Sequence, residues 1–188
     1  MDTSVTSADN RPWLFPALLV AASAVGSLAF ACVTPFAAFA VASAYALSPR
    51  PALLTIGAVW LANQLVGFAF LSYPWTLDTA LWGLAIGAAA LLATALACVV
   101  MRLWHLNIAI AVGMAAVVAF GAYEATLFLV SLSLGGEEAF APAIVGRLVL
   151  LNLGWGAALL GGYEILRYVG VRAFTHMAGA GSGRPRPA

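Results

Sequence analysis

Charge is what this sequence has least of. Charged residues make up only 8% of the 188 residues, and lysine is absent, so the eight Lys-or-Arg positions are all arginines. Soluble domains carry about 25% charged residues, which a water-exposed surface requires. The formal net charge of +1 also leaves no basic surface for nucleic acid. We therefore expect an integral membrane protein with no nucleic-acid partner.

Catalytic and cofactor-binding patterns are equally scarce. The sequence contains no H-E-x-x-H, no G-x-S-x-G and no Walker motif. Its two histidines, His105 and His176, do not fall at facing depths that would hold a haem. Cys32 and Cys98 fall near opposite ends of their predicted helices, so we expect no disulfide between them. The sequence predicts no enzymatic activity, no metal site and no bound cofactor.

Long apolar runs fill the chain instead. Hydrophobic residues make up 64% of it, and the mean hydropathy is +1.01. A helix needs about 20 apolar residues to cross a bilayer, and prolines and glycines separate the runs where helices should begin or end. The pattern predicts an all-α bundle of six transmembrane helices, over residues 13–33, 35–47, 51–72, 79–103, 106–134 and 142–171.

The second segment, 35–47, is too short to cross a bilayer upright. A five-span protein with a re-entrant hairpin at this segment is therefore the alternative topology. The arginines favour six spans, because cytoplasmic loops collect arginine. With six helices, Arg11, Arg50, Arg102 and the arginines from Arg167 onward all fall on one side, and both termini are cytoplasmic.

The segments outside the bundle are short. Residues 1–12 form a polar N-terminal tail that is too short and uncharged to begin a signal peptide. Residues 13–172 form the six-helix domain, and the Gly/Pro/Arg-rich residues 173–188 form a tail that we expect to be disordered. One membrane domain therefore accounts for nearly the whole chain.

Two ionisable residues fall within predicted membrane helices. Glu124 lies about ten residues, roughly 15 Å, inside the outer end of the fifth helix, and Arg147 lies near the outer end of the sixth. A charge at membrane depth costs about 2.5–3.5 kcal/mol on insertion scales, so each one requires a partner or a cavity. The two residues form either a structural salt bridge or part of a ligand site.

Polar and aromatic residues gather in the stretch SYPWTLDTALWG between the third and fourth helices. It contains Tyr73, Trp75, Asp78 and Trp82, and Asn63 lies midway along the preceding helix. Aromatic side chains at this level are often interface anchors, and an amide in a membrane helix often only bonds a neighbouring helix. The aspartate and the proline-shaped loop favour a cap over an outward-facing pocket.

Small residues recur in the first helix. Ala17 and Ala21 have the small-xxx-small spacing that lets helix backbones approach closely, and Gly83 and Gly87 repeat the spacing in the fourth helix. These positions serve either packing within the fold or docking on a partner membrane protein.

Taken together, these features resemble the substrate-binding S subunits of energy-coupling factor (ECF) transporters. The resemblance rests on six helices, the AxxxA face at Ala17 and Ala21, the short second helix, and the polar residues of the outer half. The stretches TPFAAFAVASAYALSPRPAL and VWLANQLVGFAFLSYPWTLDTALWGLAIG are most similar to the small bacterial S subunits associated with cobalamin and its precursors. One feature of that subgroup is missing: residues 73–82 contain no cysteine to coordinate cobalt.

The resemblance implies a multi-pass protein of the bacterial inner membrane that binds and takes up a vitamin-type solute, with cobalamin or a related precursor favoured. It also implies a coupling subunit driven by ATPases as partner, docked on Ala17 and Ala21. The ligand-facing residues would be Asn63, Tyr73, Trp75, Asp78, Trp82, Glu124 and Arg147.

Two other functions are compatible with the residues. A non-catalytic accessory or assembly subunit of a larger membrane complex would use the same small-residue faces. An ion- or proton-coupled carrier would use Glu124 and Arg147, although no internal repeat of the kind common in secondary transporters is visible in the sequence.

Overall fold

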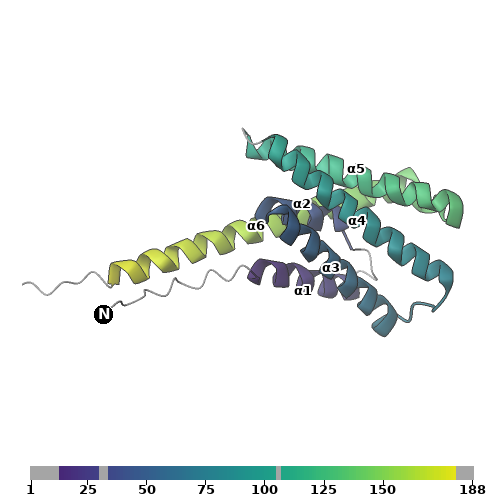
Figure 1. The fold of residues 1–188 in the computed structure, drawn as a ribbon, viewed down its shortest axis with the longest axis horizontal. Helices are drawn as coiled ribbons and strands as arrows, with labels where there is room; N and C mark the ends of the chain where they lie inside the picture. Colours follow the sequence, from purple (N-terminus) through teal and green to yellow (C-terminus); the bar gives the residue numbers. More distant parts are fainter. Residues whose placement is uncertain (1–12, 30–33, 105–106, 181–188) are drawn as a thin grey trace, which may run out of the picture.

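The described elements of the protein are all helical. The computed structural model describes residues 13–29, 34–104 and 107–180 (Figure 1). A single turn of 3-10 helix, η1 (Glu137–Phe140), precedes the last helix. The α-helices are α1 (Leu14–Ala29), α2 (Phe36–Ala46), α3 (Pro49–Phe70), α4 (Leu77–Leu103), α5 (Ile108–Leu134) and α6 (Pro142–Ala180). The predicted all-α fold is confirmed for these residues.

Four of the helices are long and apolar enough to cross a membrane. These are α3, α4, α5 and residues Pro142–Val169 of α6. The 16 residues of α1 and the 11 of α2 correspond to about 24 Å and about 16 Å of helix, less than the roughly 30 Å of a hydrocarbon core. Six complete spans and cytoplasmic termini therefore stay a prediction.

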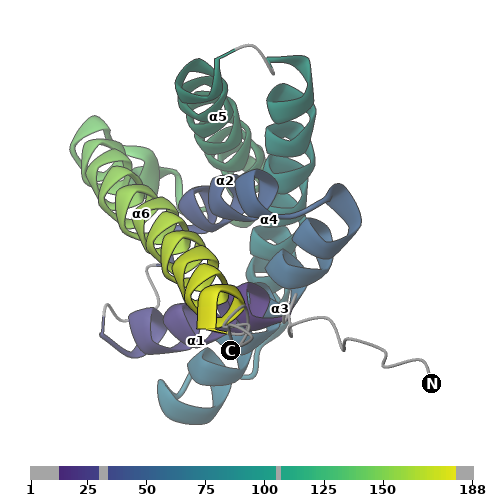
Figure 2. The same cartoon turned by 90° about the vertical axis from the view of Figure 1, so that its left-hand side faces the viewer.

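The short helix α2 lies at the centre of the bundle. Every residue from Phe36 to Ala44 is buried, and α3, α4, α5 and α6 all pack against it. Figure 2 shows α2 among the longer helices. A helix that is apolar on all sides is compatible with such an enclosed position, and its many alanines let the surrounding helices approach closely. The burial and the packing, and not the composition alone, place this segment in the core.

Two glycines of α4 form the contact between α3 and α4. A Cβ atom at Gly87 would lie 2.7 Å from the ring of Trp60, and one at Gly83 would lie 2.8 Å from Oε1 of Gln64. The Trp60 indole Nε1 donates a hydrogen bond to the carbonyl of Gly83 at 2.8 Å. The spacing of these glycines therefore serves packing within the fold.

Helix ends lie close to the predicted breakers, although several boundaries differ from the predicted ranges. Pro49 and Pro51 lie in the first turn of α3, because proline at the start of a helix removes a donor that has no helical partner. Gly135 and Gly136 end α5 with φ of 80° and 97°, a conformation that glycine adopts without a Cβ clash. The helix α6 continues to Ala180, so residues 173–180 are helical and do not belong to an irregular tail.

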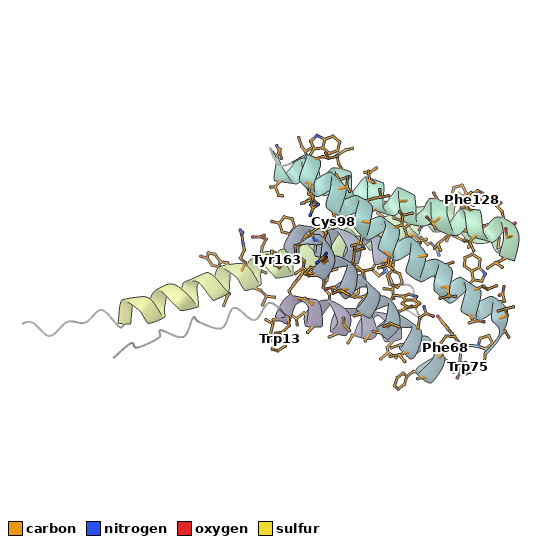
Figure 3. All side chains as sticks on the ribbon, viewed as in Figure 1. Trp13, Phe68, Trp75, Cys98, Phe128 and Tyr163 are labelled. Carbon is orange, nitrogen blue, oxygen red and sulfur yellow. The ribbon has the colours of Figure 1, made fainter. Side chains whose placement is uncertain are left out.

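The two ends of the bundle differ in composition. One end, called the arginine end below, carries Arg50, Arg102 and Arg167 on α3, α4 and α6. The other end, called the loop end, is made of the connections at 71–76 and 135–141 and the start of α2. Aromatic residues mark both levels: Figure 3 places Trp13 and Tyr163 toward the arginine end and Phe68, Trp75 and Phe128 toward the loop end.

Candidate functional site

A pocket of about 290 Å³ opens at the loop end of the bundle. Five helices and η1 contribute to it, together with the residues that precede α2 and α4. Its lining combines five aromatic rings, two amides in adjacent positions, a third amide opposite, two threonines and one carboxylate. The lining residues are Thr34, Pro35, Phe36, Asn63, Gln64, Tyr73, Thr79, Trp82, Gly83, Ile86, Tyr123, Glu124, Leu127, Ala139, Phe140, Leu148 and Asn152.

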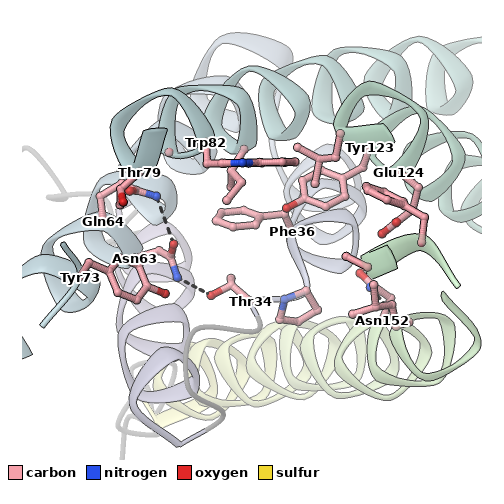
Figure 4. A pocket seen from close by; sticks show the side chains of 17 residues that line it. Thr34, Phe36, Asn63, Gln64, Tyr73, Thr79, Trp82, Tyr123, Glu124 and Asn152 are labelled. Carbon is pink, nitrogen blue, oxygen red and sulfur yellow. Dashed lines mark hydrogen bonds between the residues drawn. The ribbon is translucent and has the colours of Figure 1, made fainter. Parts of the chain in front are cut away.

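Asn63 connects three segments beside the pocket. Its Nδ2 donates to Ser27 Oγ at 3.0 Å and to Thr34 Oγ1 at 2.8 Å, and its Oδ1 accepts from Gln64 Nε2 at 3.4 Å. The hydroxyls of Ser27 and Thr34 lie 3.0 Å apart. Figure 4 shows the bonds of Asn63 to Gln64 and to Thr34 on one side of the pocket. Both Nδ2 hydrogens of Asn63 are used in these bonds. The Gln64 side chain is therefore the one of the two amides that can still bind a ligand.

Asn152 of α6 stabilises the start of α2 from the other side. Its Oδ1 accepts from the backbone N–H of Ala38 at 3.0 Å, and its Nδ2 donates to the carbonyl of Leu148 at 2.9 Å. The residue that precedes α2, Pro35, has no side-chain cap to offer. In most helices the side chain of the residue just before the helix accepts a hydrogen bond from a backbone N–H of the first turn. In α2 the side chain that does so belongs to another helix, α6.

Tyr73 and Trp82 form aromatic walls of the pocket. The Tyr73 ring lies against Gly67, where a Cβ would come within 2.5 Å of it. The turn that folds Tyr73 back passes through Ser72, which has a φ of 56°. Trp82 lies on the first turns of α4 and faces the pocket beside Phe36 and Tyr123 (Figure 4). The Phe36 and Tyr123 rings stack at 5.9 Å between centroids.

Glu124 is the single carboxylate among the residues that line the pocket. It is half-buried, and among the described residues it makes neither an ion pair nor a hydrogen bond. The salt bridge with Arg147 considered from the sequence is not formed, because the Arg147 side chain is exposed and lies outside the pocket lining. A carboxylate at this depth without a protein partner marks a ligand site more than a structural one.

Four of the seven residues predicted to face a ligand lie at the pocket, namely Asn63, Tyr73, Trp82 and Glu124. Trp75, Asp78 and Arg147 do not line it. Trp75 is 85% exposed and packs on Phe68 with 4.6 Å between ring centroids, which is the position of an interface anchor. Asp78 is exposed in the first turn of α4, where a carboxylate interacts favourably with the helix dipole.

The site also contains residues outside the predicted set. Gln64 follows Asn63 directly, and Asn152 is an amide within a predicted membrane helix, so both carried a polar signal in the sequence. Phe36, Tyr123 and Phe140 carried none, because an aromatic residue in an apolar segment reads as core or lipid-facing surface. Only the packing of α2 against α5, and η1 beside α6, brings them to one cavity.

A second cavity lies between α5 and α6, over α2. It has a volume of about 600 Å³, and its lining is apolar except for Asn152. Gly113 and Gly121 of α5 line it, and a Cβ at either would meet nothing within 4 Å. We call this cavity the apolar groove. Apart from Asn152, the apolar groove contains no side chain that could hydrogen-bond a polar solute.

The predicted docking residues Ala17 and Ala21 are exposed on α1. They share that face with Leu14, Leu18 and Val25. The opposite face of α1 is used inside the fold, where Gly26 lies against Trp155. Ala17 and Ala21 therefore do not pack inside the fold. Their role in docking a partner stays a prediction.

Two residues considered from the sequence, Cys32 and His105, lie outside the described residues. Cys98 is a buried free cysteine. Comparisons with protein-family models, with curated proteins and with solved structures returned no match. Resemblance to ECF S subunits therefore stays a prediction, and the functional argument rests on the pocket.

Proposed function

We propose that this protein binds a small vitamin-type solute in the loop-end pocket and takes it up across the bacterial inner membrane, in the manner of an ECF S subunit. One observation carries the proposal: an open pocket whose aromatic walls and amides surround a carboxylate without a protein partner. Ligand pockets are mostly apolar with a few fixed polar groups, and this lining has that composition.

The orientation follows from the arginines. Arg50, Arg102 and Arg167 lie at the end of the bundle away from the pocket, and arginine collects on the cytoplasmic side. This distribution supports a pocket that opens to the outside, as uptake would require. The arginine end would then face the cytoplasm.

The pocket volume favours a solute much smaller than cobalamin. About 290 Å³ lies at the lower limit of the roughly 300–1,000 Å³ found for drug-sized ligands, and a corrinoid with its nucleotide side chain is far larger than such ligands. The missing cysteine in residues 73–82 supports the same conclusion. We therefore propose that the vitamin-type solute is compact and contains a single ring.

Transport also requires energy, and the chain has no nucleotide-binding motif. A coupling subunit with ATPases would supply it. The exposed α1 face with Ala17 and Ala21 is the surface on which such a subunit would dock, because small residues allow close helix contact.

Binding by purified protein tests the proposal. The protein in lipid nanodiscs is analysed by mass spectrometry for a co-purified small molecule, then titrated calorimetrically with compact vitamins. We expect one solute per chain. Leu148→Trp should block binding, because Leu148 lines the pocket. Leu150→Trp, on the exposed surface of the same helix, is the matched control. Binding that survives Leu148→Trp unchanged would contradict the assignment of the pocket.

The second candidate function is a non-catalytic accessory subunit of a larger membrane complex. The observation that favours it is the apolar groove between α5 and α6, a surface of the kind that a partner helix covers. Under this alternative, the nanodisc protein binds no solute and co-purifies from native membranes with other chains.

A further inference from the structure

The charge at the loop end is strongly one-sided. Of the five acidic residues that the structure describes, four lie at this end, and only Glu164 lies toward the other. The four are Asp78, Glu124, Glu137 and Glu138. Arg147 is the one arginine of the loop end among the described residues, and its exposed side chain does not line the pocket. This excess of negative charge at the end that holds the pocket attracts solutes of the opposite sign.

Glu124 lacks a counter-charge from the protein. No arginine or histidine is among the residues that line the pocket, and lysine is absent from the sequence. The cost of a carboxylate at membrane depth is offset when a cation lies beside it. A ligand with a positive group would therefore supply what the described part of the fold does not.

The aromatic walls favour the same charge. Phe36, Tyr73, Trp82, Tyr123 and Phe140 all line the pocket, and the face of an aromatic ring attracts a cation, above all in a partly dry site. Figure 4 shows Trp82, Phe36 and Tyr123 between the amides on one side and Glu124 on the other. A cation at Glu124 would thus lie beside aromatic faces as well as the carboxylate.

A metal ion fits this pocket less well than an organic cation. Hard divalent cations take six or more oxygen ligands, several of them carboxylates. Within the described residues, no group of three or more His, Cys, Asp or Glu side chains comes together. An organic cation needs only one carboxylate, and its body fills the aromatic remainder of the cavity.

The start of α2 also borders the pocket, and a helix N-terminus would attract an anion. Two of its donors already have acceptors within the fold, however. The Phe36 N–H donates to the carbonyl of Thr34 at 2.8 Å, and the Ala38 N–H donates to Asn152 at 3.0 Å. These donors are therefore not available to an anion, and Glu124 is the charged group that lines the pocket.

We propose that the solute of the loop-end pocket is a small organic cation, an ammonium or related nitrogen cation on a compact ring. This inference rests on the proposed function and specifies its substrate class. The cationic nitrogen contacts the Glu124 carboxylate. The ring packs against Trp82, Phe36 and Tyr123, and the free amide groups of Gln64 bind the polar part of the solute.

Three probes of similar size and different charge test the substrate class. Benzyltrimethylammonium, benzyl alcohol and benzoate are titrated into the protein in phosphatidylcholine nanodiscs, whose surface carries no net charge, and binding is followed by calorimetry and tryptophan fluorescence. We expect the ammonium compound to bind at least about 30-fold more tightly than the alcohol, and benzoate to bind most weakly.

Matched variants assign the preference to one carboxylate. Glu124→Gln should reduce the preference for the ammonium compound to about three-fold or less. Glu138→Gln, at an exposed carboxylate of the same end that does not line the pocket, should leave the preference intact. Circular dichroism and gel filtration confirm that both variants fold.

Three outcomes would overturn the inference. If benzyl alcohol or benzoate binds as tightly as the ammonium compound and Leu148→Trp blocks it, the small-solute pocket stands and the cation assignment is wrong. If ammonium binding is unchanged in Glu124→Gln, the cation binds elsewhere. If no probe of any charge binds, the cation assignment again fails, and the search for a co-purified solute then decides the proposed function separately.

Discussion

Two carboxylates in membrane helices, Glu164 at the arginine end and Glu124 at the loop end, have opposite surroundings. Glu164 accepts a hydrogen bond from the Tyr45 hydroxyl at 2.7 Å and pairs with Arg167 at 3.0 Å. Glu124 has neither kind of partner among the described residues. Both are half-buried, so exposure does not explain the difference. Glu164 therefore contributes to contacts within the fold. Glu124 remains available to bind a ligand in the pocket.

The comparison predicts that substitutions at the loop end change binding and those at the arginine end change stability. Trp82→Ala should give the largest effect. Truncating a large aromatic anchor in a ligand site costs about 2 kcal/mol or more, which corresponds to roughly 30-fold in Kd. Calorimetric titration of the solute into both proteins measures this change in Kd.

Trp75→Ala is the matched control for Trp82→Ala. Trp75 belongs to the same loop-end stretch but is 85% exposed and outside the pocket, so affinity should stay within about two-fold. Equal losses in the two variants would contradict the division between pocket wall and interface anchor.

Gly87→Ala should give the next largest effect, which is a loss of folding stability. A Cβ at Gly87 would lie 2.7 Å from the Trp60 ring, which is rigid and bonded to Gly83. Overpacking of this kind costs about 1–3 kcal/mol. Unfolding in mixed micelles measures it. Gly113→Ala, where nothing lies within 4 Å, serves as the control and should be neutral or slightly stabilising.

Tyr45→Phe should destabilise the protein by about 1 kcal/mol, because it removes the hydrogen bond to Glu164. Solute affinity should be unchanged, since Tyr45 lies at the arginine end. The same unfolding assay and a binding titration check both statements. Loss of affinity without loss of stability would break the assignment of Glu164 to the fold.

Glu124→Gln should give the smallest change in stability, within about 0.5 kcal/mol of the wild type in the absence of solute. No partner among the described residues is lost with the charge. Glu164→Gln, which loses the ion pair with Arg167, is the control and should be less stable than Glu124→Gln. The opposite order of unfolding midpoints would show that Glu124 supports the fold.

Much of the architecture was visible in the sequence because hydropathy and breakers act locally. The helix positions of α3, α4 and α5 follow from apolar length and from Pro74, Gly135 and neighbouring residues. The central place of α2 could not be predicted, because an apolar alanine-rich segment is compatible with a core, a lipid-facing surface or a hairpin. Its enclosure by four helices is a property of the whole bundle.

The pocket was predictable only where a residue looked out of place. Glu124, Asn63 and the Tyr73 to Trp82 stretch were polar or clustered, so they could be identified. Trp75 and Arg147 satisfied the same criteria and yet do not line the cavity, because sequence position does not give the direction of a side chain. Phe36 and Phe140 lacked any signal, since their role depends on which helices meet.

The bonds that anchor α2 also set an order of events during synthesis at the membrane. The cap of α2 arrives with Asn152, 114 residues after Ala38, and the partner of Tyr45 arrives with Glu164, 119 residues later. The contacts of α2 are therefore completed only when α6 packs against it, and a chain that stops before Asn152 lacks both of these bonds.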